Sequence, residues 1–196
     1  ISLEVRPGVF IPRPETEVLV DVALDAIGDV ARPVVVDVGT GTGAVALSVK
    51  AERPDAIVYA TDLSAEAVKL ARANADRLAL EVTIIQGDAL EPLPDDLSDV
   101  ALVVSNPPYL TGEELNGAPR EVRADPELSL LGGTTMHRRL AASAASRLRP
   151  AGSLVLEIGA SQGEEVAAAL RAEGYFDVSV GLDLAGRDRV VRGRRP

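Results

Sequence analysis

A regular alternation of strand-like and helix-like segments constrains the fold of this chain more than any other feature. Short apolar runs rich in Val and Ile, typical of buried strands, occupy residues 34–38, 57–61, 82–85, 100–105 and 153–158. Helix-like segments follow most of them, at residues 44–50, 64–78, 140–148 and 164–173. Strands that alternate with helices pair in parallel, and the helices cover both faces of the sheet. The sequence therefore predicts an α/β fold.

The C-terminal region breaks this alternation. Residues 176–180 and 189–192 read as two strands with a short loop and no helix between them, so we expect an antiparallel pair at one edge of the sheet. The predicted fold is thus a seven-stranded, mostly parallel sheet with an antiparallel C-terminal strand. That is the Rossmann-like, class I S-adenosylmethionine-dependent methyltransferase fold, whereas dehydrogenases usually lack the antiparallel strand. Arg192, Arg194 and Arg195 are predicted to form a solvated tail.

A glycine cluster lies between the first strand and the first helix of this alternation. Gly39 permits a tight turn, Gly41 allows the backbone to approach a ligand, and Gly43 permits close packing at the helix start. The helix N-terminus offers free amide groups to an anionic part of a ligand. Asp62 ends the next strand, where its carboxylate can accept hydrogen bonds from both hydroxyls of a ribose. These features predict a nucleotide-like cofactor.

The glycine spacing alone leaves two cofactors open, because Gly39, Gly41 and Ala44 also fit the dinucleotide-binding pattern. Asp37, inside the preceding strand, suits the ammonium group of S-adenosylmethionine and is an unfavourable neighbour for a pyrophosphate. Asp88 ends the third strand, where it can accept from an adenine amino group. We therefore predict S-adenosylmethionine as cofactor and S-adenosylhomocysteine as product. The predicted cofactor-binding residues are Asp37, Gly39, Thr40, Gly41, Thr42, Gly43, Asp62, Leu63, Asp88, Ala89 and Asn106.

The methyl acceptor is indicated by Asn106, Pro107, Pro108 and Tyr109, which follow the fourth strand. In open α/β sheets, ligands bind at the carboxyl ends of the strands. The side-chain carbonyl of Asn106 and the backbone carbonyl of Pro107 are two acceptors that consecutive prolines hold rigidly. Tyr109 adds a flat face for a planar group. These four residues, which we predict to be catalytic, can grip an NH2 group and aim its nitrogen at a sulfonium methyl group.

Composition narrows the possible partners. The chain has 196 residues, a net charge of −10 and no cysteine. An acidic chain is a poor match for a phosphate backbone, so we expect no direct contact with nucleic acid. Disulfides and thiolate metal sites are excluded, and we expect no metal site. No signal peptide or membrane-spanning run is visible, and we expect a cytoplasmic protein.

The segment before the first strand is predicted to be a helix that leads into the core. Pro14 suits its first turn, and an apolar stripe follows at Leu19, Val22, Ala23, Ala26 and Ile27. We therefore divide the chain into an N-terminal segment, 1–31, and a methyltransferase domain, 32–196. The first residue is Ile1, which suggests an excised or processed fragment. Residues 106–134 are expected to form a functional loop, and His137 is expected on a solvated helix face.

The chain resembles the peptide-chain release factor glutamine N5-methyltransferases, the HemK/PrmC family, over nearly its whole length. The residues that carry the resemblance are FIPRPETE at 10–17, DVGTGTGAVAL at 37–47, SNPPY at 105–109, LSLLGG at 128–133, LEIG at 156–159 and DLAGRDRV at 183–190. NPPY alone is shared with adenine and guanine N-methyltransferases. The block at 10–17 separates this family from those enzymes.

The resemblance implies methylation of N5 of the glutamine in the GGQ loop of bacterial class I release factors. It adds Arg13, Glu15 and Thr16 to residues 106–109 as substrate-binding residues. Two departures from the family concern the loop: Asp125-Pro126 replaces the usual Glu-Pro, and residues 134–136 lack an Asp-Gly pattern. The family also has a small N-terminal helical domain, which is not seen in this sequence.

Three other functions remain open from the sequence. An N-methyltransferase acting on adenine or guanine in nucleic acid shares the NPPY motif, but it fits poorly with the negative charge and the block at 10–17. A nicotinamide-dependent oxidoreductase would use the glycine pattern and leave NPPY without a role. A non-catalytic nucleotide-binding module would leave the intact acceptor motif unexplained.

Overall fold

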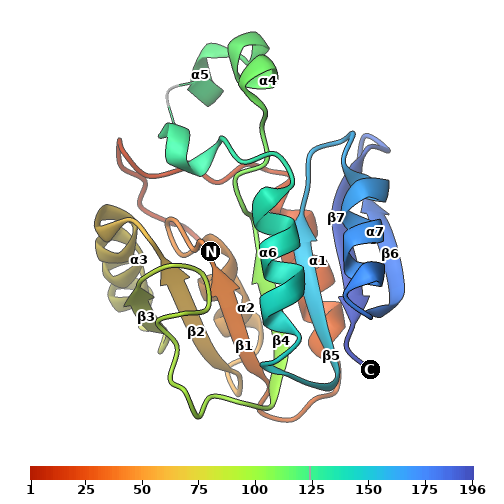
Figure 1. Ribbon diagram of the computed structural model, residues 1–196. Coiled ribbons are helices and arrows are strands. Elements are labelled where there is room, and N and C mark those ends of the chain that lie inside the picture. The colour runs from red at the N-terminus through yellow and green to blue at the C-terminus, as the bar shows by residue number, and fades with distance from the viewer. Residues whose placement is uncertain (124) are drawn as a thin grey trace.

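A single mixed β-sheet forms the centre of the molecule (Figure 1). The computed structural model describes residues 1–123 and 125–196. Its sheet has seven strands in the order β3-β2-β1-β4-β5-β7-β6. The strands are β1 Val34–Val38, β2 Ile57–Asp62, β3 Thr83–Gln86, β4 Val100–Ser105, β5 Leu148–Glu157, β6 Phe176–Leu182 and β7 Asp188–Arg194. The strands from β1 to β5 pair in parallel, and β7 is antiparallel to both β5 and β6. The predicted fold class is confirmed.

Helices cover both faces of the sheet because consecutive strand residues point to opposite sides. In β1, Val35 packs into one core cluster and Val36 into the other. The first cluster contains α1, α2 and α3, and the second contains α6 and α7 (Figure 1). These helices are α1 Thr16–Ile27, α2 Ala44–Glu52, α3 Ala65–Leu78, α6 Thr135–Ala144 and α7 Gly163–Ala172.

The predicted N-terminal helix is present, with a later start. Leu19, Ala23 and Ile27 are fully buried, so the predicted apolar stripe does face the core. The helix begins at Thr16, and Pro14 lies in the turn before it. The start matters for function because it places the buried Thr16 side chain at the carboxyl end of β5, where it reaches Glu157.

The predicted antiparallel pair of C-terminal strands at one edge of the sheet is confirmed, and both strands are longer than expected. The last strand, β7, is inserted between β5 and β6, and it pairs with β5 as far as Arg194. Arg192 forms a 2.6 Å ion pair with Asp25, and Arg194 lies 3.3 Å from Asp177. The Arg195 side chain donates to the Leu148 carbonyl, and its backbone amide donates to the Gly152 carbonyl at 2.8 Å. The predicted solvated tail is therefore wrong for all three arginines, because backbone hydrogen bonds to β5 hold this end of the chain.

The long segment after β4 contains short helices. These are α4 Gly112–Gly117, α5 Arg120–Arg123 and the 3-10 helix η1 Glu127–Ser129. The chain then returns to the acceptor motif, where the Leu110 amide donates to the Leu130 carbonyl at 2.8 Å. The Gly132 amide donates back to the Leu110 carbonyl at 3.1 Å. In Figure 1, α4 and α5 project beyond the carboxyl ends of the parallel strands.

The position of α6 corrects two expectations. The predicted helix over 140–148 begins earlier, at Thr135, and Leu148 instead starts β5, where it pairs with Val100. This earlier start turns the His137 side chain into the core, so the prediction that it is solvated is wrong. His137 is fully buried, and its Nε2 lies 2.8 Å from the backbone carbonyl of Glu157. Burial lowers the pKa of His137, which favours the neutral ring.

Candidate active site

A cavity of about 720 Å³ lies at the carboxyl ends of β1, β2, β4 and β5. It brings together most of the residues that the sequence analysis selected. Those that line it are Arg13, Glu15, Thr16, Asp37, Gly39, Thr40, Gly41, Thr42, Asp62, Leu63, Asp88, Ala89, Asn106, Pro108 and Tyr109. Gly43 and Pro107 are not among the lining residues. Their roles at a ligand remain predictions.

The glycine cluster takes the shape that its composition predicts. Gly39, Gly41 and Gly43 all have positive φ, at 73°, 56° and 87°, where residues other than glycine are strained. A Cβ atom at Gly43 would lie 2.8 Å from Leu47 Cδ1, so this glycine serves helix packing. The space beside Gly39 and Gly41 is open. The loop thus presents bare backbone to the cavity.

Asp62 ties the glycine loop to the end of β2. Its Oδ2 accepts from the Gly41 amide at 2.8 Å, and its Oδ1 accepts from the Ser64 amide at 2.9 Å. Burial raises the pKa of Asp62, although both amide hydrogen bonds oppose that effect. Each carboxylate oxygen has a second lone pair. Asp62 can therefore hold the loop and still accept from a ribose.

Asp37 is buried beneath the same loop. Its Oδ2 accepts from the Thr40 hydroxyl at 2.7 Å and from the Ala46 amide at 3.1 Å, at the start of α2. Burial raises the pKa of Asp37 to about 6, and the hydrogen bond from Thr40 partly offsets this effect. A cationic ammonium group beside Asp37 would favour its ionised form.

Asp88 is engaged by a cation from α6. Arg139 Nη1 lies 2.8 Å from both oxygens of Asp88, and its Nη2 lies 2.8 Å from Glu91. The adjacent Ala89 carbonyl accepts from the buried Thr61 hydroxyl at 2.8 Å, which fixes this segment to β2. Thr61 also receives the Gly39 amide at its carbonyl. The sequence analysis did not select Thr61, because a threonine inside a strand carries no distinctive signal.

The lining fits S-adenosylmethionine. Open glycine backbone, one carboxylate at the end of β2 and one half-exposed carboxylate after β3 suit a methionyl group, a ribose and an adenine respectively. The volume lies within the range of small-ligand pockets and leaves room for an acceptor side chain. Among the described residues, no cluster of three or more His, Cys, Asp or Glu side chains could hold a metal ion.

The acceptor motif is held on several sides. Asn106 Nδ2 donates to Thr16 Oγ1 at 3.5 Å, and the Tyr109 carbonyl accepts from Gln162 Nε2 at 2.8 Å. Gly132 packs directly against the Pro108 carbonyl, where a Cβ atom would clash. Burial raises the pKa of Tyr109 to about 12, so its hydroxyl stays protonated. The loop at residues 106–109 is thus held in place by these contacts, and it carries the neutral Tyr109 hydroxyl and the Asn106 side-chain amide.

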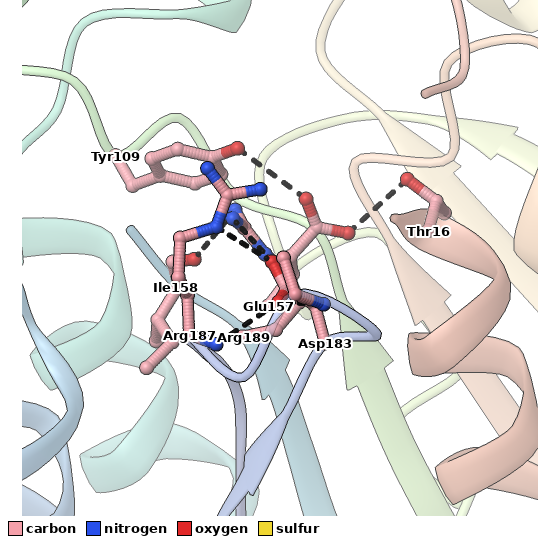
Figure 2. A network of polar contacts seen from close by, with 8 residues as sticks. Thr16, Tyr109, Glu157, Ile158, Asp183, Arg187 and Arg189 are labelled. Atoms are coloured by element: carbon pink, nitrogen blue, oxygen red, sulfur yellow. Dashed lines mark hydrogen bonds and ion pairs between the residues drawn. The ribbon is translucent and has the colours of Figure 1, made fainter. Parts of the chain in front are cut away.

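Glu157 is the principal residue that the sequence analysis missed. It ends β5, only 1% exposed, and its Oε2 accepts from Thr16 Oγ1 at 3.1 Å while its Oε1 accepts from Tyr109 Oη at 3.4 Å (Figure 2). Burial raises the pKa of Glu157 to about 7, against the hydrogen bond from Thr16 and the charge of Arg189. A signal was present: a carboxylate at the carboxyl end of a central parallel strand points to the ligand-binding edge.

The residues before α1 close the cavity by contacting a segment far along the chain. Asp125, largely buried, forms an ion pair with Arg13 and accepts from the Ile11 amide at 3.3 Å. The Arg13 guanidinium lies 5.5 Å from the centre of the Phe10 ring. The departure from the family's Glu-Pro therefore falls on a residue that joins the two walls of the cavity.

Comparisons with known proteins agree with this geometry. Residues 4–121 match the Methyltransferase small domain family. The chain is 46% identical over 189 residues to the release factor glutamine methyltransferase of Deinococcus radiodurans, covering 95% of this chain and 66% of that protein. It is 44% identical to the enzyme of that name from Moorella thermoacetica, covering 96% of this chain and 68% of that protein. The chain thus spans about two thirds of the length of these relatives.

A solved structure supports the same assignment. The protein-(glutamine-N5) methyltransferase (release factor-specific) from Alicyclobacillus acidocaldarius superposes with a TM-score of 0.59 at 31% identity, covering 98% of this chain and 99% of that one. These relatives confirm the predicted family, and with it the enzyme class and the cofactor, S-adenosylmethionine. In this chain, which is similar to these relatives, the glycine loop, Asp62 and the motif at 106–109 lie at one cavity. The chain belongs to the release factor glutamine methyltransferase family.

Proposed function

We propose that this chain transfers a methyl group to the side-chain amide nitrogen, N5, of the glutamine in the GGQ motif of class I release factors. One observation carries the proposal: Asn106 and Tyr109 line the same cavity as the glycine loop and Asp62. An acceptor held by the motif at 106–109 therefore lies next to the cofactor. The relatives named as release factor enzymes supply the substrate class.

The residues of the chain divide the work between two parts of the cavity. Asp37, residues 39–42, Asp62, Leu63, Asp88 and Ala89 would hold S-adenosylmethionine, which when bound supplies an electrophilic methyl group. In the acceptor part, Asn106 accepts one hydrogen of the glutamine NH2, and the Pro107 carbonyl accepts the other. Two acceptors raise electron density on a nitrogen whose lone pair is delocalised. The Tyr109 ring packs against the planar amide and excludes water.

Arg13, Glu15 and Thr16 form the wall of the acceptor part nearest the start of α1. We assign them to substrate binding, and Thr16 also contacts Asn106. In this proposal, residues 1–31 close the cavity over the methyltransferase domain at 32–196. No helix among the described residues is long and apolar enough to cross a membrane. Because release factors act at the ribosome, we place the reaction in the cytoplasm.

Methylation of adenine or guanine in nucleic acid is the competing activity, because residues 106–109 could also grip an exocyclic amine. The net charge of −10 disfavours it. The test is incubation with labelled S-adenosylmethionine and either a class I release factor, the same factor with its GGQ glutamine replaced by alanine, or RNA and DNA. We expect label only in the unmodified release factor. Label in nucleic acid, or in the alanine variant, would contradict the proposal.

A further inference from the structure

Glu157 connects both ends of the acceptor motif. Its Oε1 accepts from the Tyr109 hydroxyl, and its Oε2 accepts from the Thr16 hydroxyl at 3.1 Å (Figure 2). Thr16 Oγ1 in turn accepts from Asn106 Nδ2 at 3.5 Å. A chain of hydrogen bonds therefore runs from Glu157 through Thr16 to the side chain that is expected to bind the acceptor amide.

The direction of this chain determines what Asn106 can do. A threonine hydroxyl carries one proton. While Glu157 is ionised it can only accept, so the Thr16 proton points toward Glu157 and Thr16 Oγ1 is left as an acceptor. The NH2 group of Asn106 then faces Thr16, and its Oδ1 faces away from Thr16. That oxygen is the atom needed to accept from a substrate NH2.

We propose that Glu157 is a positioning residue that, through Thr16, fixes the orientation of the Asn106 amide and keeps Asn106 Oδ1 available to the acceptor nitrogen. The inference rests on the proposed function. It gives a purpose to a carboxylate that is otherwise costly to bury. It also explains why the acceptor motif is joined to the start of α1, far away in the sequence.

Protonation of Glu157 reverses the direction of the hydrogen bonds that connect Glu157, Thr16 and Asn106. A protonated Glu157 can donate to Thr16, whose own proton then points toward Asn106. The Asn106 amide must then rotate, so that its Oδ1 accepts from Thr16 and is no longer available to the substrate NH2. Burial raises the pKa of Glu157 to about 7, so this change falls in an accessible range. The groups around Glu157 act in different directions. Arg189 on β7 and the Thr16 and Tyr109 hydroxyls lower its pKa, Glu15 before α1 raises it, and the neutral His137 on α6 contacts only its backbone carbonyl.

The first test removes the Thr16 hydroxyl, which is the middle link in the series of hydrogen bonds from Glu157 to Asn106. Thr16→Val keeps the side-chain shape and deletes the hydroxyl, whereas Thr16→Ser retains the hydroxyl. With saturating S-adenosylmethionine and intact release factor, we expect Thr16→Val to lower kcat roughly 5- to 10-fold, as the loss of one hydrogen bond does. Kd for the cofactor should change less than about 2-fold, and the loss in kcat should exceed any rise in KM for the release factor. Thr16→Ser should recover most of the lost kcat.

A matched control is Thr134→Val, which deletes a threonine–glutamate contact of 2.6 Å to Glu165 between α6 and α7, at exposed positions. We expect wild-type kcat. If the kcat of Thr16→Val equalled that of the wild type, the hydrogen bonds from Glu157 through Thr16 to Asn106 would have no role in catalysis. If wild-type protein failed to label release factor at all, the proposed function would fail instead, so the two failures are distinguishable.

The second test uses pH. Wild-type kcat should rise with pH through about 7, where Glu157 ionises, and this rise should be absent in Glu157→Gln and in Thr16→Val. Saturating cofactor removes any contribution from Asp37 to cofactor binding. The side-chain amide resonances of Asn106, followed by NMR without substrate, should titrate with the same midpoint in wild type and lose that midpoint in both variants. An unchanged pH profile and unchanged resonances in Glu157→Gln would overturn the proposal.

Discussion

The two halves of the cavity are built in different ways. The cofactor half, residues 39–43 with Asp62 and Asp88, follows three adjacent parallel strands. Its main contact, from Gly41 to Asp62, joins residues 21 apart. The acceptor half combines Thr16, residues 106–109 and Glu157, and its contact from Thr16 to Glu157 joins residues 141 apart. Short-range geometry shapes the first half, whereas only the completed sheet assembles the second.

The largest effect should follow from the acceptor half. We expect Asn106→Ala to lower kcat by about 10²-fold or more, because it deletes an acceptor that acts in the transition state. Cofactor affinity should fall only slightly although Asn106 is itself a predicted cofactor contact, because Asp62 and the glycine loop are untouched. Steady-state kinetics with release factor, together with calorimetry of cofactor binding, check both statements. Normal methyl transfer by Asn106→Ala would remove the functional distinction between the two halves.

Local signals explain how much of the molecule could be predicted from sequence. The glycine cluster, Asp62 and the motif at 106–109 each follow directly after a recognisable strand, so their places at one sheet edge could be predicted. Glu157 also ends a strand, but its importance comes from Thr16 and Tyr109, which are distant in sequence. The prediction that His137 is solvated was wrong for a related reason. The helix α6 begins five residues earlier than predicted, and His137 therefore lies on its buried face.

The second effect concerns stability and tests the burial of Glu157. The pKa of Glu157 is raised from 4.5 to about 7, so its contribution to stability is fully present below pH 4.5 and is lost as pH rises through about 7. The loss corresponds to roughly 3 kcal/mol. Glu157→Gln lacks this titration. Urea unfolding at pH 5 and pH 8 should therefore show wild type losing stability relative to the variant.

This comparison cancels the other buried carboxyl, because Asp37 is present in both proteins and its pKa is raised to about 6 in each. A difference in unfolding free energy that did not change between pH 5 and pH 8 would mean that Glu157 is better solvated than its 1% exposure implies.

A third effect belongs to the cofactor half. Asp62→Ala should weaken S-adenosylmethionine binding by about 1–3 kcal/mol, the cost of losing a charged hydrogen-bond acceptor. The variant also frees the Gly41 amide, so the loop itself should loosen. Asp62→Asn keeps one acceptor oxygen, so its affinity for the cofactor should lie between those of the wild type and Asp62→Ala. Calorimetry measures all three proteins, and equal affinities would remove Asp62 from the cofactor site.

The smallest effect should come from Asp88. Its carboxylate is about 38% exposed and already pairs with Arg139. An exposed ion pair contributes below about 1 kcal/mol. Asp88→Asn should therefore change the free energy of unfolding by less than that, and weaken cofactor binding only severalfold. Arg139→Ala is the matched partner: if Asp88 contacts the adenine, removing Arg139 should leave cofactor binding nearly intact. A larger loss in Arg139→Ala would assign the contact to the arginine.

The insertion of β7 between β5 and β6 also sets an order of assembly. A chain leaves the ribosome N-terminus first, and its early segments can begin to fold before later ones exist. Until β7 is made, β5 has an unpaired edge, and Arg189 cannot reach the Ile158 carbonyl beside Glu157. A nascent chain could thus form the cofactor half while the acceptor half is unfinished. An unpaired strand edge can pair with a strand of another molecule. The period of synthesis before β7 is complete is therefore the stage at which the nascent chain is most prone to aggregate.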